Sequence, residues 1–202
     1  NMKICLVLPY DISITGGVTN HVVNFAIELQ EKGQDITILT TSSKNNFLIK
    51  DVEIFNLGKP VPIKFGSTVA NILLSWKSLF RVYNFFKKNK FDIVHIHEPL
   101  VPFISIFSTI FSRSKTVLTF HATLKKNWKF RAWGLLLKPW IEAKKYIIAV
   151  SNSAHNSIEM YNYNLASNLY PNGVINHFFL KSNKLKKDKL KILFVGRNEK
   201  RK

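Results

Sequence analysis

The fold of this chain is decided by residues 3–40, KICLVLPYDISITGGVTNHVVNFAIELQEKGQDITILT. Lys3–Leu8 is an almost continuous apolar run, which is typical of a strand that is buried on both faces of a sheet. A helical spacing of apolar residues follows over Val18–Lys32, with Gly33 as its stop signal, and Asp35–Thr40 forms a second strand-like run. A strand, a helix and a strand in this order predict a parallel β-α-β unit with a right-handed crossover.

The alternation of apolar runs and helical patterns continues along the chain. Further strands are predicted at Val52–Asn56, Ile93–His97, Thr116–Thr119 and Tyr146–Val150, in a short segment ending at Tyr170, and at Lys191–Val195. Further helices are predicted at Val69–Asn89, at Val101–Phe111, within Trp128–Lys145 and at Ser153–Tyr161. These elements predict an α/β fold with a doubly wound, Rossmann-like parallel sheet. We expect one domain over residues 2–175, a basic linker over 176–190, and the first strand and loop of an incomplete second domain over 191–202.

Composition and charge limit the classes of function. The chain has 202 residues, 46% of them hydrophobic, and it lacks the ~18-residue apolar run that predicts a transmembrane helix. Cys5 is the only cysteine, which excludes a disulfide framework. The net charge is +18, and residues 76–202 hold all of the excess, with 24 basic and six acidic side chains against six of each in residues 1–75. The base composition of the source genome would explain many lysines but not this distribution, which predicts a polyanionic partner, either anionic lipid or nucleic acid.

The loop after the first strand ends in two glycines at the start of a helix. In a parallel sheet, ligands bind at the carboxyl ends of the strands, so this loop is a candidate site. Gly16 and Gly17 would let the backbone approach a phosphate at the helix N-terminus, although a plain turn would also use them. Thr19, Asn20 and His21 fill the later positions of the dinucleotide fingerprint, which disfavours a nicotinamide or flavin cofactor.

A second candidate site is the segment His95-Ile96-His97-Glu98-Pro99 at the end of a predicted strand. His95 and His97 share one face of the strand, a spacing that can bind zinc, but no third ligand is evident nearby. We therefore expect hydrogen bonding there and no metal. Glu98 would accept a hydrogen bond from a substrate hydroxyl, and His21 would face the same crevice or pack at the surface.

Seven segments, in this order, resemble the family 4 glycosyltransferases, which are retaining enzymes of the GT-B fold. The likeness is greatest to enzymes of the phosphatidylinositol mannosyltransferase type. The matching segments are Lys3–Tyr10, Gly16–Val22, Phe91–Pro99, Thr119–His121, Ile148–Ser151, Pro171–Val174 and Phe194–Arg197. The chain departs from the family pattern at Ile175, where Asp is frequent, and at Asn71, where lipid-mannosylating members tend to have Arg.

The resemblance implies a role for each matching residue. His121 would be catalytic, next to the transferred sugar, although a packed histidine at a strand end is the alternative. The donor diphosphate would be bound by Gly16, Gly17, Arg197 and Lys202. The acceptor would be bordered by Tyr10, His21, His97 and Glu98. The donor would be a nucleotide sugar such as GDP-mannose or a UDP-sugar, with no metal and no further cofactor.

The predicted helix Val69–Asn89 has two faces. Its apolar stripe comprises Ile72, Trp76, Leu79, Phe80 and Tyr83. Its basic side chains are Lys77, Arg81, Lys87 and Lys88, with Lys90 just beyond. A basic amphipathic helix with aromatic residues is typical of proteins that bind the surface of an anionic membrane, although a helix packed on the core would look similar.

These observations predict retaining glycosyl transfer from a nucleotide sugar to a lipid headgroup or glycan, by a peripheral protein at the cytoplasmic face of the membrane. We expect the 202-residue chain to be inactive alone. The alternatives are a non-enzymatic basic domain that binds anionic lipid or nucleic acid, another Rossmann-type enzyme, or a lectin-like domain. The sequence contains no helix-turn-helix, zinc-finger or RNA-recognition signature, so we expect no nucleic acid partner.

Overall fold

The computed structural model describes residues 1–65, 68–122, 128–144, 146–159, 161, 163, 166–173 and 192–193. Its strands are β1 (Lys3–Asp11), β2 (Asp35–Thr41), β3 (Glu53–Asn56), β4 (Val61–Phe65), β5 (Thr68–Ile72), β6 (Ile93–His97), β7 (Lys115–Phe120), β8 (Tyr146–Ala149) and β9 (Ser167–Leu169). Its helices are α1 (Gly17–Glu31), α2 (Lys77–Lys88), α3 (Ile104–Phe111), α4 (Trp128–Leu136), α5 (Lys138–Glu142) and α6 (Asn152–Glu159).

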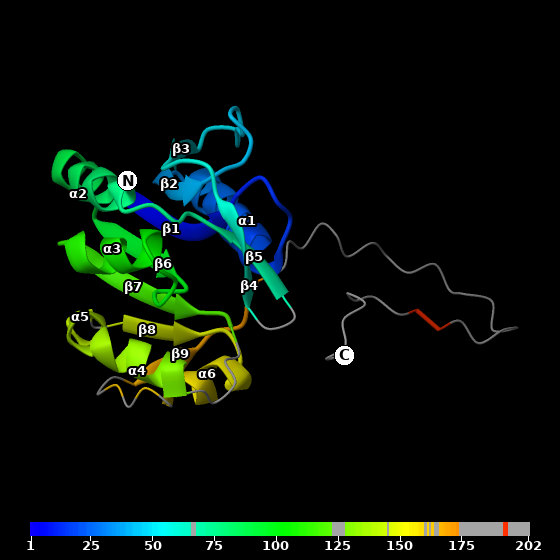
Figure 1. The fold of residues 1–202 in the computed structure, drawn as a ribbon. Helices are drawn as coiled ribbons and strands as arrows, with labels where there is room; N and C mark the ends of the chain where they lie inside the picture. The colour runs from blue at the N-terminus through cyan, green and yellow to red at the C-terminus, as the bar shows by residue number, and fades with distance from the viewer. Residues whose placement is uncertain are drawn as a thin grey trace, which may run out of the picture.

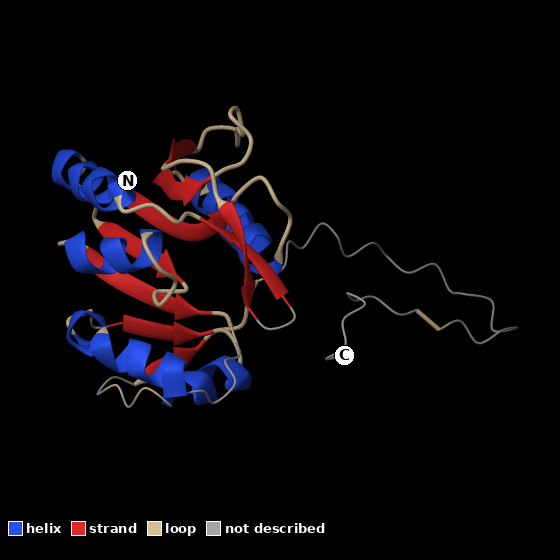
Figure 2. Cartoon of the chain, viewed as in Figure 1, coloured by secondary structure: helices blue, strands red, loops and turns tan. Residues whose placement is uncertain are grey.

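The parallel strands lie in the order β3-β2-β1-β6-β7-β8-β9. The strand order therefore reverses between β1 and β6, which is the point where ligands bind in sheets of this type. Helices pack on both faces of the sheet (Figure 1), and strands and helices alternate along the chain (Figure 2). The predicted doubly wound, Rossmann-like α/β fold is confirmed.

The two faces of the sheet bury separate apolar cores. Cys5 and Val7 of β1 belong to the core that also includes side chains of α2, α3, α5 and α6. Leu6, between them in the sequence, belongs to the opposite core with Val22 and Ala26 of α1. The continuous apolar run of β1 is thus explained, because successive side chains enter different cores.

The prediction of one helix over Val69–Asn89 is wrong in its first part. Residues up to Ile72 form β5, which pairs with β4 in an antiparallel hairpin, and α2 begins only at Lys77. The hairpin joins β1 through the pair Tyr10 and Ile72. The sequence Val61-Pro-Ile-Lys-Phe alternates at a period of two, the signal that would have predicted β4.

The second half of the chain follows the predicted order with different boundaries. The helical region within Trp128–Lys145 consists of α4 and α5, and Pro139 in the first turn of α5 explains the break because proline lacks a backbone N–H. The predicted linker 176–190 and most of the strand at Lys191–Val195 lie outside the described residues. Within the described ranges, no helix has the length and apolar character that crossing a bilayer requires.

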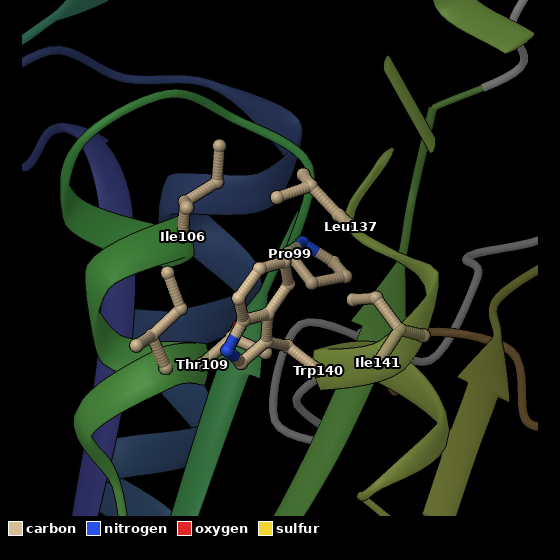
Figure 3. A pocket seen from close by; sticks show the side chains of 7 residues that line it. Pro99, Ile106, Thr109, Leu137, Trp140 and Ile141 are labelled. Atoms are coloured by element: carbon tan, nitrogen blue, oxygen red, sulfur yellow. The ribbon is translucent and has the colours of Figure 1, made fainter. Parts of the chain in front are cut away.

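A shallow apolar seam lies between α3 and the start of α5. Figure 3 shows the side chains that form it around Pro99: Ile106, Thr109, Leu137, Trp140 and Ile141. The seam leaves no space for a water molecule. Pro99 directly follows Glu98. Its packing against α3 and α5 therefore holds the loop after β6 in place.

Candidate functional site

The carboxyl ends of β1, β6 and β7 meet at one edge of the sheet. Residues Val7 and Ile96 pair across β1 and β6, and His97 pairs with Thr119 across β6 and β7. The loop from β1 to α1 lies at the same edge. The three segments that sequence analysis singled out are therefore neighbours in space.

The loop after β1 is held by Asp11. Its buried carboxylate accepts hydrogen bonds from the backbone N–H of Ser13 (2.9 Å), the Ser13 hydroxyl (2.7 Å) and the backbone N–H of Ser43 (3.2 Å). Burial alone would raise the pKa of this carboxyl, but the hydrogen bonds from Ser43 and Ser13 outweigh it and lower the pKa. Asp11 is thus ionised at neutral pH and fixes the loop that leads to the two glycines.

Gly16 and Gly17 leave the start of α1 open. A Cβ atom added at Gly17 would meet nothing within 4 Å, and one at Gly16 would meet only the Thr19 hydroxyl at 3.8 Å. Gly16 is extended (φ −163°), a conformation that any residue adopts, so the chain itself does not require glycine there. Among the described residues, the N-cap residue makes no side-chain hydrogen bond to this helix and its first turn holds no acidic residue, an arrangement that suits an anion at the first N–H groups.

Four histidines, His21, His95, His97 and His121, form what we call the histidine cluster. The rings of His95 and His97 stack with centroids 4.3 Å apart, as their shared strand face predicted. His21 of α1 lies over the strand ends, 5.6 Å from the ring of His97 and 5.3 Å from that of His121. His97 Nδ1 and His121 Nε2 are hydrogen-bonded at 2.9 Å, and His95 Nε2 bonds to the Thr119 hydroxyl at 2.6 Å.

Burial keeps the histidine cluster neutral at pH 7. Desolvation lowers the pKa of His95 and of His121 to about 3, and neighbouring histidines add to the effect. The same causes lower the pKa of His97 well below its usual value, and burial lowers that of His21. Each ring therefore carries one N–H donor and one lone pair.

The hydrogen bond between His97 and His121 leaves both rings incompletely paired. One facing nitrogen must donate and the other accept, so one outer nitrogen is an N–H and the other a lone pair. These outer atoms, Nε2 of His97 and Nδ1 of His121, are buried and lack partners in the described part of the chain. An unpaired buried polar group costs about 1–3 kcal/mol and calls for an explanation. Ser108 Oγ and Tyr161 Oη are also unpaired in the described part of the chain, but only the two histidine nitrogens belong to the histidine cluster.

Glu98 supports this arrangement from the loop after β6. Its Oε1 accepts hydrogen bonds from the backbone N–H of His121 (2.8 Å) and of Ala122 (2.6 Å). Burial raises the pKa of the Glu98 carboxyl to about 7, although these two hydrogen bonds oppose the shift. Sequence analysis did not foresee these partners, because nothing in the sequence relates Glu98 to the backbone of another strand; its predicted contact with an acceptor hydroxyl stays a prediction.

Tyr10 lies near the same edge, at the end of β1. Burial raises the pKa of its hydroxyl above the usual range, and the charge of Glu98 adds to this shift. The structure thus brings together Tyr10, His97, Glu98 and His121, with His21 above them. Arg197 and Lys202, the predicted diphosphate ligands on the far side, lie outside the described residues.

Three histidines also meet the first requirement of a metal site. One ring nitrogen each from His21, His97 and His121 lies within 4.8 Å of the others, so the structure provides the third ligand that the sequence did not reveal. A cation shared by His97 and His121 would take the facing nitrogens and move each proton to the outer nitrogen. Metal-bound histidines normally donate that N–H to a partner, and no partner lies in the described part of the chain. The chemistry thus fits hydrogen bonding better than a metal, and the absence of a metal stays our prediction.

The basic residues of α2 lie apart from this edge. Lys77, Lys87, Lys88 and Lys90 are exposed, as are Trp76 (75%), Phe80 (67%) and Tyr83 (43%). We call these seven residues the α2 face. Arg81, also predicted to contact the membrane, is exposed too, and its guanidinium donates to the backbone carbonyls of Leu57 and Asn56; its membrane contact stays a prediction. The core side of α2 is formed instead by Ser78, Val82 and Phe85.

Comparison with known proteins places these features in a family. Residues 15–175 match the model of Glycosyltransferase Family 4. The phosphatidyl-myo-inositol mannosyltransferase of Mycobacterium leprae is 30% identical over 153 residues, 76% of this chain and 40% of that protein. The enzyme of the same name from Propionibacterium freudenreichii is 28% identical over 158 residues. The chain thus spans about two fifths of the length of these curated relatives.

Solved structures share the fold at low sequence identity. HepE of Anabaena, solved in complex with UDP-glucose, matches with a TM-score of 0.62 at 11% identity, over 90% of this chain and 47% of that chain. A glycosyltransferase of Rickettsia africae matches with a TM-score of 0.55 at 20% identity, over 82% of this chain and 42% of that chain. The fold is therefore that of one half of a GT-B glycosyltransferase. Because the family match extends over most of the sequence and the fold agrees with it, the chain belongs to glycosyltransferase family 4.

Proposed function

We propose that this chain is the acceptor-side domain of a retaining glycosyltransferase that moves a hexosyl group from a nucleotide sugar to a lipid headgroup at an anionic membrane surface. The observation that carries the proposal is the meeting of an open helix N-terminus with the histidine cluster at the edge where the strand order reverses. A candidate phosphate site beside ring nitrogens that lack partners in the described part of the chain suits a nucleotide sugar.

The donor diphosphate would bind at the start of α1. Gly16 and Gly17 present no side chain there, so phosphate oxygens can reach the free N–H groups of the first turn. Arg197 and Lys202 would approach from a donor-binding second domain, which the length of the relatives supports. Fixed N–H groups and cations of this kind stabilise the negative charge that grows on the leaving diphosphate.

His121 would act where the sugar is transferred. During transfer the bond from the anomeric carbon to the diphosphate oxygen breaks, and a bond to the acceptor oxygen forms on the same face of the sugar. His121 has one ring nitrogen without a partner, Nδ1, which would pair with a hydroxyl of the sugar or acceptor. Since Nδ1 is buried in the described conformation, the ring must turn away from His97 for this contact. Tyr10 and His21 would border the acceptor.

The α2 face would hold the protein at the membrane, on the cytoplasmic side. Its aromatic rings are exposed although they are large, and its lysines are exposed on the same helix and just beyond its end. This combination is typical of interfacial helices, in which aromatic rings enter the headgroup region and lysines bind anionic lipids. The relatives named as phosphatidyl-myo-inositol mannosyltransferases support a lipid acceptor.

The experiment is a transfer assay with the complete gene product and a panel that includes GDP-mannose and UDP-sugars, with and without phosphatidylinositol vesicles. We expect one donor to be used, lipid-dependent product, and an unchanged anomeric configuration. A folded protein that binds anionic vesicles but transfers no sugar from any donor would support the alternative of a non-enzymatic basic domain. Stoichiometric binding of single-stranded DNA at physiological salt would favour a nucleic acid partner instead.

A further inference from the structure

Glu98 combines two unfavourable features in one residue. Its side chain is buried, with 7% of its surface exposed, and its backbone has φ +50°. A buried carboxylate is costly unless it is well bonded, and a left-handed conformation is strained for any residue other than glycine. Such features persist only where the surroundings hold them, and they gather at functional sites.

The carboxylate takes the place of a missing strand partner. The ladder of β7 with β8 ends at Phe120, whose carbonyl accepts the backbone N–H of Val150 (3.2 Å). The next two amides, of His121 and Ala122, project beyond that ladder, and both donate to Oε1 of Glu98. One oxygen therefore fixes the direction of the chain on both sides of the His121 Cα atom.

The other side of Glu98 is anchored as well. Its backbone N–H donates to the carbonyl of Thr119 (2.8 Å), and its carbonyl accepts the N–H of Val101 (3.0 Å). Pro99, the next residue, is packed into the seam between α3 and α5 (Figure 3). Glu98 therefore links the packed loop after β6, through its carboxylate, to the backbone of His121 and Ala122.

We propose that Glu98 is a positioning residue that fixes the backbone on both sides of His121 and thereby places its ring at the carboxyl edge of the sheet, from where the ring can turn toward a bound sugar or acceptor. Its catalytic consequence rests on the proposed function of His121. Displacement of a catalytic group by an ångström is sufficient to slow a reaction about 100-fold, so a single carboxylate can have a large effect without touching the substrate.

Three substitutions separate the hydrogen bonds from the strain. Glu98→Gln keeps a carbonyl oxygen that can accept both amides, whereas Glu98→Ala removes the acceptor. Glu98→Gly also removes the acceptor but relieves the left-handed strain, so this variant should fold even if Glu98→Ala does not. Glu53→Ala is the control, because its carboxylate accepts the Thr37 hydroxyl (2.9 Å) in a different part of the sheet.

The direct readout is NMR of the 202-residue chain with labelled histidine and backbone nitrogen. We expect Glu98→Gly to speed amide exchange at His121 and Ala122 and to shift the ring nitrogen signals of His97 and His121. Glu98→Gln and Glu53→Ala should leave these signals near those of the wild type. Unchanged exchange and ring signals in Glu98→Gly would overturn the proposal.

The kinetic readout uses the complete gene product. We expect Glu98→Gly to lower kcat about 10- to 100-fold with little change in the KM of the donor, and Glu98→Gln to recover most of the loss. An equal loss in Glu98→Gln and Glu98→Gly would contradict positioning, since a carboxylate that binds the acceptor directly predicts that result. If the wild type shows no turnover, the proposed function fails, and the NMR comparison still decides whether Glu98 positions His121.

Discussion

The carboxyl edge of the sheet and the α2 face differ in burial, charge and geometry. At the edge, neutral histidines are buried against one another, and hydrogen bonds join His97 to His121 and Glu98 to the backbone of His121. On the α2 face, lysines and aromatic rings are exposed, with Lys87 held only loosely over the Tyr83 ring at 6.0 Å. The difference indicates that the two regions have different functions. Catalysis at the carboxyl edge needs side chains in fixed positions, whereas binding of the α2 face to a charged surface needs only exposed charge and a sufficient contact area.

The largest expected effect is the loss of transfer in His121→Ala. General acid–base and polar contacts of a catalytic histidine contribute about 100- to 10,000-fold, so we expect kcat to fall within that range. Rates of sugar transfer by the complete gene product measure it. His155→Ala is the control, because His155 lies on α6 and bonds to Ser167 away from the edge. Equal rates of transfer for His121→Ala and His155→Ala would show that the histidine cluster is not the catalytic site.

The second prediction concerns stability against pH. His95 and His121 have pKa values of about 3 in the folded protein and near 6.5 when unfolded, so below pH 6.5 the unfolded chain binds protons that the folded rings do not, and stability falls. Each should cost about 2 kcal/mol between pH 6.5 and 5. Glu98, with its raised pKa, acts in the opposite direction but is a single group. Urea unfolding at pH 7 and 5 measures the change, and His95→Gln should reduce it; equal stability at both pH values would contradict a buried neutral cluster.

The third prediction tests the open helix end. Gly17→Val adds a side chain where the protein leaves space, so we expect normal thermal stability but about tenfold weaker donor binding. Gly33→Ala is the control with the opposite expected result. Because Gly33 has a φ of +78°, any side chain there is strained, so stability should fall while donor binding is kept. Calorimetry with the nucleotide sugar measures both. Unchanged donor affinity in Gly17→Val would place the diphosphate elsewhere.

The smallest expected effect for a single substitution lies on the α2 face. Each lysine near an anionic surface contributes about 1 kcal/mol, so Lys77→Gln should weaken vesicle binding severalfold, and substitution of all four lysines should abolish it at physiological salt. Vesicle sedimentation measures the effect. Arg81→Gln should instead lower stability, because its guanidinium binds the carbonyls of Asn56 and Leu57. Vesicle binding that survives the loss of all four lysines would refute a membrane role for this face.

The same contrast explains what the sequence could predict. The order of elements, the buried strands and the edge that carries the site follow from periodicity, because each apolar run must enter a core. The shared face of His95 and His97 follows from strand geometry alone. The sequence left open whether His21 would face the strand ends or pack at the surface, since that depends on how α1 crosses the sheet.

Contacts between a side chain and the backbone of a distant segment could not be predicted from the sequence either. The bonds from Glu98 to the amides of His121 and Ala122, and from Arg81 to the carbonyls before β4, join segments that no local pattern relates. The hairpin of β4 and β5 was missed because the aromatic residues after it extend an apparent helical spacing backwards, so tertiary pairing decided the structure there.

The difference in function between the two regions is tested most directly by one comparison of acceptors. Transfer would be measured with a water-soluble inositol phosphate headgroup and with phosphatidylinositol in vesicles, for the wild type, His121→Ala and the variant lacking the four lysines of the α2 face. We predict that His121→Ala loses transfer to both acceptors, whereas the α2 variant keeps transfer to the soluble headgroup and loses transfer to vesicles. Loss of both activities in the α2 variant, or their survival in His121→Ala, would contradict the separation of chemistry from membrane binding.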